Sequence, residues 1–281
     1  MIEEVIEMVQ YKTMYYPSYD ADLNAVKENG LYLKYIEKQD DSLCYEAIKQ
    51  NPRAIKYVKN QTEDLCLMSV QKNGDALQLI HELSHEIILT AVRNEGLALR
   101  HVLFQNAEIC LAAVMQNGFA LRYVRQQTEQ ICQVAVQAHP QAIKYVKQQT
   151  EALCCMALRK DGMVIRDILN PTSSMYLMAI ENNPMSIQFI DNPSKDLCEH
   201  AVKLRPYAIQ HIDVYYEDLW MKAIEQRAFV IKFLNVYSEK ILKYALRFNP
   251  VSLKYIKKEF QSEIIINFAL SKDARMRKYI R

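Results

Sequence analysis

A period of 22 residues constrains this chain more than any other feature of its sequence. One alanine recurs at this spacing, and a fixed period of about 20 to 50 residues is typical of a stacked array of repeats. We use this alanine as a marker and number the other positions of each repeat from it. The markers are Ala25, Ala47, Ala91, Ala113, Ala135, Ala157, Ala179, Ala201, Ala223 and Ala245, with Ser69 in the gap and a twelfth copy at Ala269. The last spacing is 24 residues, which places a two-residue insertion near Glu259 and Phe260.

Each repeat begins with the pattern of a short amphipathic helix. Apolar residues four and three positions before the marker, at the marker and one position after it share one helical face. Seven positions before the marker the residue is Ser, Thr, Asn or Asp, except at Tyr216. Such side chains cap a helix by accepting a hydrogen bond from a free amide of its first turn. We therefore predict a first helix of about ten residues in each repeat.

The second half of each repeat predicts a turn and a second helix. All five glycines and five of the eight prolines stand five positions after the marker. Apolar residues then follow at plus eight and plus eleven, which predicts a second helix of about eight residues. Helices this short need neighbours to bury their apolar faces. The fold class is therefore predicted as all-α, an αα-hairpin solenoid of about twelve 22-residue repeats.

The repeat also predicts the domain organisation. Residues 18–281 form one continuous solenoid, residues 1–17 an N-terminal cap segment, and the last repeat, about 259–281, an atypical C-terminal cap in which Arg277 replaces the buried leucine. No stretch approaches 18 uncharged apolar residues, and the first residues are acidic where a signal peptide is basic. We therefore expect an intracellular, cytoplasmic protein that does not enter membranes. With 35 basic and 33 acidic residues, any attraction to a charged partner must be local.

Two motifs that suggest chemistry are better explained by the repeat. Six of the seven cysteines stand three positions before the marker, where other repeats carry large apolar residues, which indicates a buried slot. His81 to His85 spell H-E-x-x-H, a zinc-protease pattern. The phase, however, places His81 at the end of one repeat and Ser84 at the helix cap of the next. We predict no catalytic residues, no metal site and no cofactor, so the chain is not expected to be an enzyme.

One surface feature supports a functional hypothesis. Nine of the twelve residues at plus nine are basic, and aromatic residues recur beside them at plus ten. In a solenoid one phase becomes one row, so these residues should form parallel basic and aromatic rows. The candidate binding residues are Lys34, Tyr35, Lys56, Tyr57, Arg100, Arg122, Tyr123, Lys144, Tyr145, Arg166, Lys232, Phe233, Lys254 and Tyr255.

Three interpretations of these rows remain open. The rows suit an acidic peptide, or a single-stranded nucleic acid held by phosphate pairing and base stacking. A purely structural interpretation competes with both, since Lys and Arg are common at polar helix positions and tyrosines pack between repeats. Acidic residues at Glu37, Asp191 and Asp213 dilute the positive charge.

The block from Glu108 to Cys154 resembles a helical-repeat family catalogued as a domain of unknown function, number 4116, found in giant DNA viruses and some bacteria. The shared features are the Cys or apolar slot, the Ala-Val marker, Asn before Gly or Pro, and an Ala-Leu-Lys-Tyr-Val run. The resemblance implies helical repeats and an intracellular setting, in host cytoplasm or virion if the source is viral, and implies no activity. We expect a non-catalytic protein-binding scaffold, a viral or effector-like adaptor, with sequence-independent nucleic-acid binding as the alternative.

Overall fold

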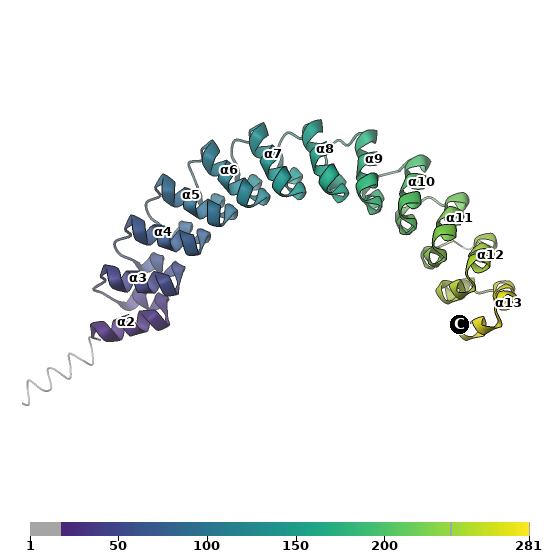
Figure 1. The fold of residues 1–281 in the computed structure, drawn as a ribbon, viewed down its shortest axis with the longest axis horizontal. Helices are drawn as coiled ribbons and strands as arrows, with labels where there is room; N and C mark the ends of the chain where they lie inside the picture. Colours follow the sequence, from purple (N-terminus) through teal and green to yellow (C-terminus); the bar gives the residue numbers. More distant parts are fainter. Residues whose placement is uncertain (1–17, 237, 281) are drawn as a thin grey trace, which may run out of the picture. The chain divides into compact units, whose positions relative to one another are not determined.

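A computed structural model describes residues 18–236 and 238–280. Twelve α-helices of ten residues alternate with 3-10 helices of six residues, apart from one additional 3-10 helix of three residues before the last α-helix. No strand occurs among these residues (Figure 1). The chain is an all-α helical-repeat solenoid, as predicted. The predicted cap segment 1–17 lies outside the described residues.

The packing divides the chain into two compact units, one ending at Lys147 and the other beginning at Gln148. The sequence had predicted one continuous array, and the order of elements does continue without a break in phase through this boundary. The α-helices of the first unit are α2 (Tyr19–Glu28), α3 (Asp41–Gln50), α4 (Glu63–Lys72), α5 (His85–Asn94), α6 (Ala107–Gln116) and α7 (Glu129–Ala138). Its 3-10 helices are η1 (Gly30–Tyr35), η2 (Pro52–Tyr57), η3 (Gly74–Leu79), η4 (Gly96–His101), η5 (Gly118–Tyr123) and η6 (Pro140–Tyr145).

The second unit repeats the same alternation. Its α-helices are α8 (Glu151–Lys160), α9 (Ser173–Asn182), α10 (Lys195–Leu204), α11 (Glu217–Gln226), α12 (Glu239–Phe248) and α13 (Glu263–Lys272). Its 3-10 helices are η7 (Gly162–Asp167), η8 (Pro184–Phe189), η9 (Pro206–His211), η10 (Ala228–Phe233), η11 (Pro250–Tyr255), η12 (Lys258–Phe260) and η13 (Ala274–Tyr279). The short helix η12 lies where the sequence predicts the two-residue insertion.

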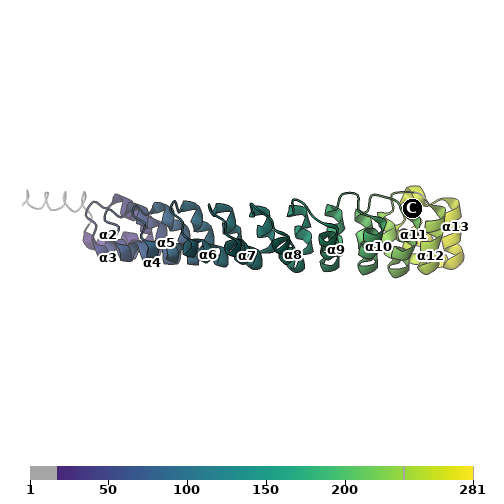
Figure 2. The ribbon, with the colours of Figure 1, turned by 90° about the horizontal axis from the view of Figure 1, so that it is seen from above.

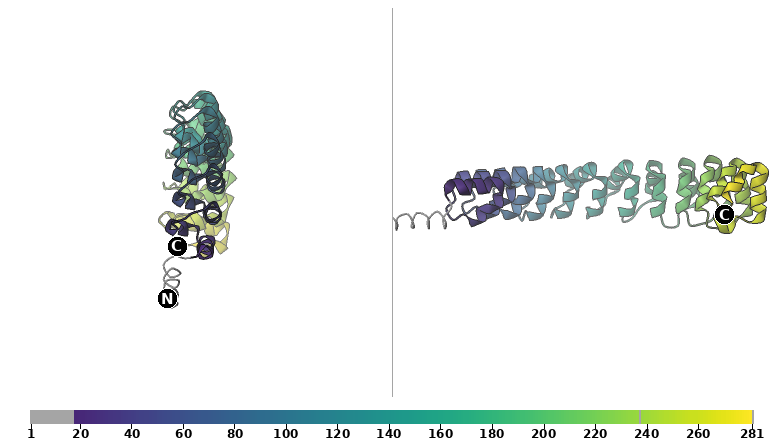
Figure 3. Two further views of the ribbon diagram at one scale, coloured as in Figure 1. Left: turned by 90° about the vertical axis from the view of Figure 1, so that its left-hand side faces the viewer. Right: turned by 90° about the horizontal axis from the view of Figure 1, so that it is seen from below.

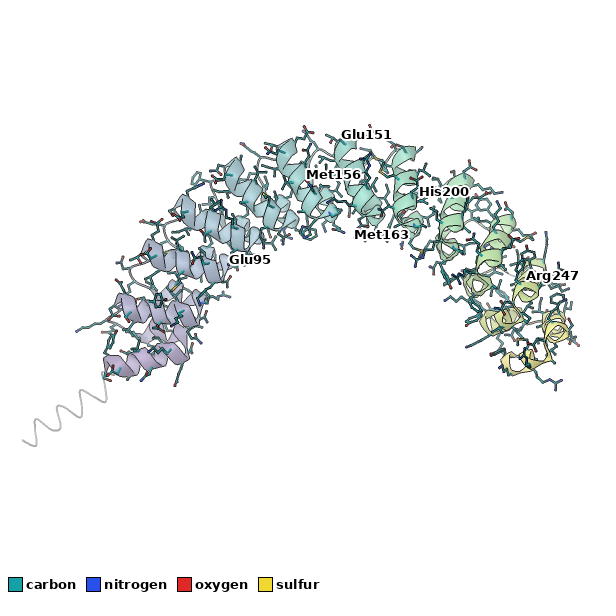
Figure 4. The ribbon with its side chains drawn as sticks, viewed as in Figure 1. Glu95, Glu151, Met156, Met163, His200 and Arg247 are labelled. Carbon is teal, nitrogen blue, oxygen red and sulfur yellow. The ribbon has the colours of Figure 1, made fainter. Side chains whose placement is uncertain are left out.

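Within each unit the elements form two layers. Each α-helix packs on the α-helix of the next repeat, and most 3-10 helices pack on the next 3-10 helix, so like elements form rows (Figures 2 and 3). Turns between the two helix types line one edge and the connecting loops line the other. In the second unit Met163, at such a turn, and Glu151, in the first turn of α8, lie at opposite edges (Figure 4).

The second helix of each repeat is a 3-10 helix of six residues, where the sequence predicts a helix of about eight. A 3-10 helix is wound more tightly than an α-helix. The inward positions of this second helix are plus five, plus eight and plus eleven, a spacing of three that matches the three residues per turn of a 3-10 helix. In η1, for example, Gly30 and Leu33 are buried and Ile36, which follows the helix, is 6% exposed. An α-helix of the same length would rotate these positions apart.

The predicted caps occupy the first helix boundaries. Thr128 accepts a hydrogen bond from the Ile131 amide at 3.3 Å at the start of α7, whereas Tyr216 makes no such bond. A single residue often ends one helix and begins the next. The backbone amide of Asn29 donates to the carbonyl of Ala25 at the end of α2. The side-chain Oδ1 of Asn29 accepts from the backbone amide of Leu31 at 3.1 Å, at the start of η1.

Glycine at the turns reflects close contact between repeats, since no described glycine has a positive φ. A Cβ on Gly118 would overlap the carbonyl oxygen of Ala135, the marker of the following repeat. The freed space also lets the Gly118 amide donate to His139 at 3.1 Å.

Proline at this position removes that donor. Accordingly, α4 and α5, which flank Gly74, contact each other more extensively than α10 and α11, which flank Pro206.

A glutamine that the sequence analysis did not single out joins neighbouring repeats. In the example of Gln127, Nε2 donates to the carbonyls of Leu121 (3.3 Å) and Tyr145 (2.9 Å), and Oε1 accepts from the Lys147 amide (2.9 Å). The Cys132 thiol lies 3.8 Å from the same oxygen. The glutamine thus provides hydrogen-bond partners for backbone groups at the ends of 3-10 helices in two successive repeats. The residues at this position, eight before the marker, are Gln39, Gln61, Gln105, Gln127, Gln149 and Gln261.

The last repeat differs from the others at plus eight. Arg277 occupies the plus-eight position and is exposed, while Met276 beside it is 3% exposed and fills the core instead. The core of this unit therefore ends on a methionine, and its final 3-10 helix presents charge to solvent.

Candidate interaction surface

The 3-10 helices place the basic row at the surface of each unit. All twelve residues at plus nine are exposed, and those at plus ten are half-buried apart from Tyr35, which is 66% exposed. Because a 3-10 helix has three residues per turn, plus nine faces away from the buried positions plus eight and plus eleven, on the opposite flank from plus seven and plus ten, where Ala54 is buried and Tyr57 half-buried. The structure therefore brings the predicted residues into parallel rows within each unit.

The cations of the basic row lie over the rings of the aromatic row. Lys34 Nζ is 4.4 Å from the centroid of the Tyr35 ring, and the Arg122 guanidinium is 4.5 Å from that of Tyr123. Lys144 lies 4.9 Å from the Tyr145 centroid. Lys56, Lys232, Lys254 and Lys278 make the same contact with the aromatic residue that follows each of them. Most of the aromatic faces are therefore already covered by the basic row itself.

These contacts shift the pKa values of Lys34, Arg122 and Tyr145. Hydrogen bonds to Tyr123 and Tyr145 raise the pKa of Arg122, and a hydrogen bond to Tyr35 raises that of Lys34. Burial raises the pKa of Tyr145, but hydrogen bonds from Arg122 and Lys144 outweigh burial and leave it below its ordinary value. The side chains of Lys34 and Arg122 therefore hold their protons more tightly than usual.

Aromatic residues at plus six extend the packing between repeats. Phe119 of one repeat packs edge-on against Tyr145 of the next, with centroids 6.4 Å apart. Tyr207 and Phe233 make the equivalent contact in the second unit at 6.2 Å. These contacts support the structural interpretation of the aromatic row, whose rings brace neighbouring 3-10 helices.

Cations are more frequent in the plus-nine row of the first unit than in that of the second. Five of the six plus-nine residues of the first unit are basic, and Lys59, Arg125 and Lys147 add charge at plus twelve, where Glu37 is the acidic residue. In the second unit the row is interrupted. Glutamines replace the cations at Gln188 and Gln210, and the acidic residues Asp167, Asp191 and Asp213 lie at plus ten and plus twelve. Arg166, Lys232 and Lys254 therefore do not form one unbroken cationic row.

The row of the first unit is itself interrupted at its centre. Gln78 takes the plus-nine position of η3, and the next cation, Arg100, pairs with Asp75. His101 lies 2.9 Å from the same carboxylate. Asp75 stands at plus six, where three other repeats carry Phe119, Tyr207 and Phe229. The charge of Arg100 is therefore neutralised from the preceding repeat.

The four remaining cations of this row have no acidic partner. Lys34, Lys56, Arg122 and Lys144 pair with no carboxylate among residues 18–236 and 238–280. We call these four residues the free cations.

The cysteine slot is buried, as predicted. The six slot cysteines are at most 4% exposed. Burial raises the pKa of each of their thiols, that of Cys44 to about 11. These thiols are therefore poor nucleophiles at neutral pH.

The H-E-x-x-H residues span a junction between repeats. His81 lies in the loop after η3, Ser84 caps α5, and His85 is the first residue of that helix. The His85 ring contacts the Glu108 carboxylate at 3.1 Å. No group of three or more His, Cys, Asp or Glu side chains in the described residues is placed to hold a metal ion. None of the described helices is both long and apolar enough to cross a membrane.

Two segments of the first unit carry a known repeat. Residues 23–61 and 84–127 match the family described as a domain of unknown function (DUF4116). The predicted resemblance is thereby confirmed over these segments. The second DUF4116 segment begins at the Ser84 cap and ends at Gln127, so it covers two whole repeats. The two segments include Lys34, Lys56, Arg100 and Arg122 of the basic row. No match was found among curated proteins or among solved structures.

Proposed function

We propose that this chain is a non-catalytic scaffold that binds an acidic segment of another protein through the basic row of its first unit. The free cations are the observation that carries the proposal. Four exposed positive charges on one face, without acidic partners, attract an anionic chain that runs along the repeats. The proposal places this binding in the cytoplasm.

Single-stranded nucleic acid is the alternative partner. Its phosphates could pair with the same cations, but binding of this kind also uses aromatic rings on which bases stack. Lys34, Arg122 and Lys144 lie over the rings beside them, so bases would first have to displace those cations. Tyr35, although exposed, is covered in the same way. This competition favours an acidic peptide.

Binding of fluorescent polyglutamate to the full chain, followed by anisotropy, tests the proposal. The test variant combines Lys56→Gln with Lys144→Gln, since glutamine occupies the same position at Gln78, Gln188 and Gln210. The control combines Lys27→Gln with Arg93→Gln at plus two of α2 and α5, where other repeats carry Gln71 and Gln137. Both variants remove two exposed positive charges.

We expect polyglutamate affinity to fall about tenfold in the test variant and about twofold or less in the control. Equal losses in the two variants would show that net charge alone drives binding and would overturn the proposed surface. Tighter binding of single-stranded RNA than of polyglutamate at the same salt concentration would favour the alternative.

A further inference from the structure

We infer that the partner segment adopts a polyproline II conformation and carries acidic side chains every third residue, with a gap opposite the middle of the first unit. This inference rests on the proposed function and specifies the chemistry of its partner. It follows from the spacing of the repeats and from the position of the Asp75 pair.

The spacing of the basic row selects the conformation of the partner. Neighbouring packed helices lie about 8 to 10 Å apart, so the row presents one charge per such step. Polyproline II has three residues per turn and rises about 3.1 Å per residue, which brings every third side chain to the same side at about 9.3 Å. A β-strand rises about 3.3 Å per residue and alternates its side chains, so those on one side recur at about 6.6 or 13 Å. Of these two extended conformations, polyproline II is the one whose period matches the row.

The interruption of the row selects the pattern of acidic residues. Along η1 to η6 the plus-nine residues are a cation, a cation, glutamine, a neutralised arginine, a cation and a cation. A partner of six triplets therefore gains charge pairs from its first, second, fifth and sixth triplets. The third and fourth triplets face Gln78 and the Arg100–Asp75 pair, where an acidic side chain gains little. This pattern is the same in both directions, so it does not depend on the polarity of the bound peptide.

Two synthetic peptides of equal composition test the inference on the full chain. Both have six triplets, one for each 3-10 helix of the first unit, and each triplet ends in Pro-Pro to impose polyproline II. The split peptide carries glutamate in triplets one, two, five and six and glutamine in the others. The block peptide carries glutamate in triplets two to five. In every register the block peptide reaches at most two of the free cations.

We expect the split peptide to bind about tenfold more tightly than the block peptide, because it forms two more exposed ion pairs. Lys56→Gln with Lys144→Gln leaves Lys34 and Arg122, of which the split peptide reaches both and the block peptide only one, so the preference should fall to about threefold. Lys27→Gln with Arg93→Gln should keep the full preference. Circular dichroism of both variants, with unchanged helix content, confirms that the fold is intact.

The possible failures are distinguishable. Equal affinity for the split and block peptides, with polyglutamate still bound through the basic row, overturns the inference and leaves the proposed function standing. Loss of binding to every acidic peptide overturns both. A split-peptide preference that stays at about tenfold in the test variant shows that another surface reads the pattern and also overturns the inference.

Discussion

Gln127 donates a hydrogen bond from its side-chain Nε2 to the backbone carbonyl of Tyr145, 2.9 Å away and 18 residues further along the chain. Tyr145 belongs to the aromatic row, and the glutamine lies at the loop edge between two repeats. The bond ties the end of η6 to the preceding repeat. It shows that the candidate surface is positioned by a polar contact as well as by the apolar core.

Replacing Gln127 with alanine should destabilise the first unit. The change leaves the carbonyls of Leu121 and Tyr145 and the amide of Lys147 without their side-chain partner, which costs about 1 to 3 kcal/mol. Urea unfolding followed by circular dichroism measures the loss. The adjacent exposed residue provides the control, since Gln126→Ala should change the free energy of unfolding by less than about 0.5 kcal/mol. Equal effects of the two changes would contradict the bridging role.

Gly118→Ala tests whether glycine serves close approach between repeats. The added methyl group would overlap the Ala135 carbonyl, and overpacking of this kind costs about 1 to 3 kcal/mol. The reverse change at the same phase, Ala228→Gly, should cost about 1 kcal/mol or less, since only backbone entropy is lost. Thermal unfolding of both variants compares them. A Gly118→Ala protein as stable as the parent would refute the close contact.

Alkaline pH should weaken the fold through the cysteine slot. Burial raises the pKa of Cys44 from 9.0 to about 11, so the folded state holds this proton more tightly than the unfolded state. The resulting stability is fully present below pH 9 and is lost as the pH rises towards 11. Cys44→Ile places a residue that other repeats carry in this slot and should reduce the loss of stability measured between these pH values. Cys155→Ser, outside the slot, serves as the control and should leave the pH dependence unchanged.

Removing the carboxylate of Asp75 should strengthen binding of acidic peptides. Asp75→Asn keeps the shape of the side chain but releases the charge of Arg100, which adds a fifth cation to the row. One additional exposed ion pair is expected to raise polyglutamate affinity about threefold. Asp64→Asn removes an exposed charge from α4 and provides the comparison. Anisotropy titrations that show the same gain in both variants would assign the effect to net charge.

Much of this fold can be predicted from the sequence because a given position of the repeat is buried or exposed in the same way in successive repeats. The marker, the cap and the inward positions recur in nearly every repeat, so a chance match such as H-E-x-x-H can be recognised as a junction between two repeats. The bridging glutamines were missed because polar residues in a loop carry no periodic apolar signal. Their pairing with cysteine in five repeats was a detectable clue, since Gln39, Gln61, Gln105, Gln127 and Gln149 each precede a slot cysteine by five residues.

The sequence by itself determined the all-α class, the repeat boundaries, the buried slots and the exposure of the basic row, since these follow from local periodicity and capping. Only the tertiary structure decided which cations remain unpaired. Arg100 and Asp75 are 25 residues apart and meet because one repeat stacks on the next. Contacts between repeats of this kind decide whether a charge is neutralised and whether an aromatic ring is covered by a cation. The distances between repeats that set these contacts are not contained in the sequence pattern.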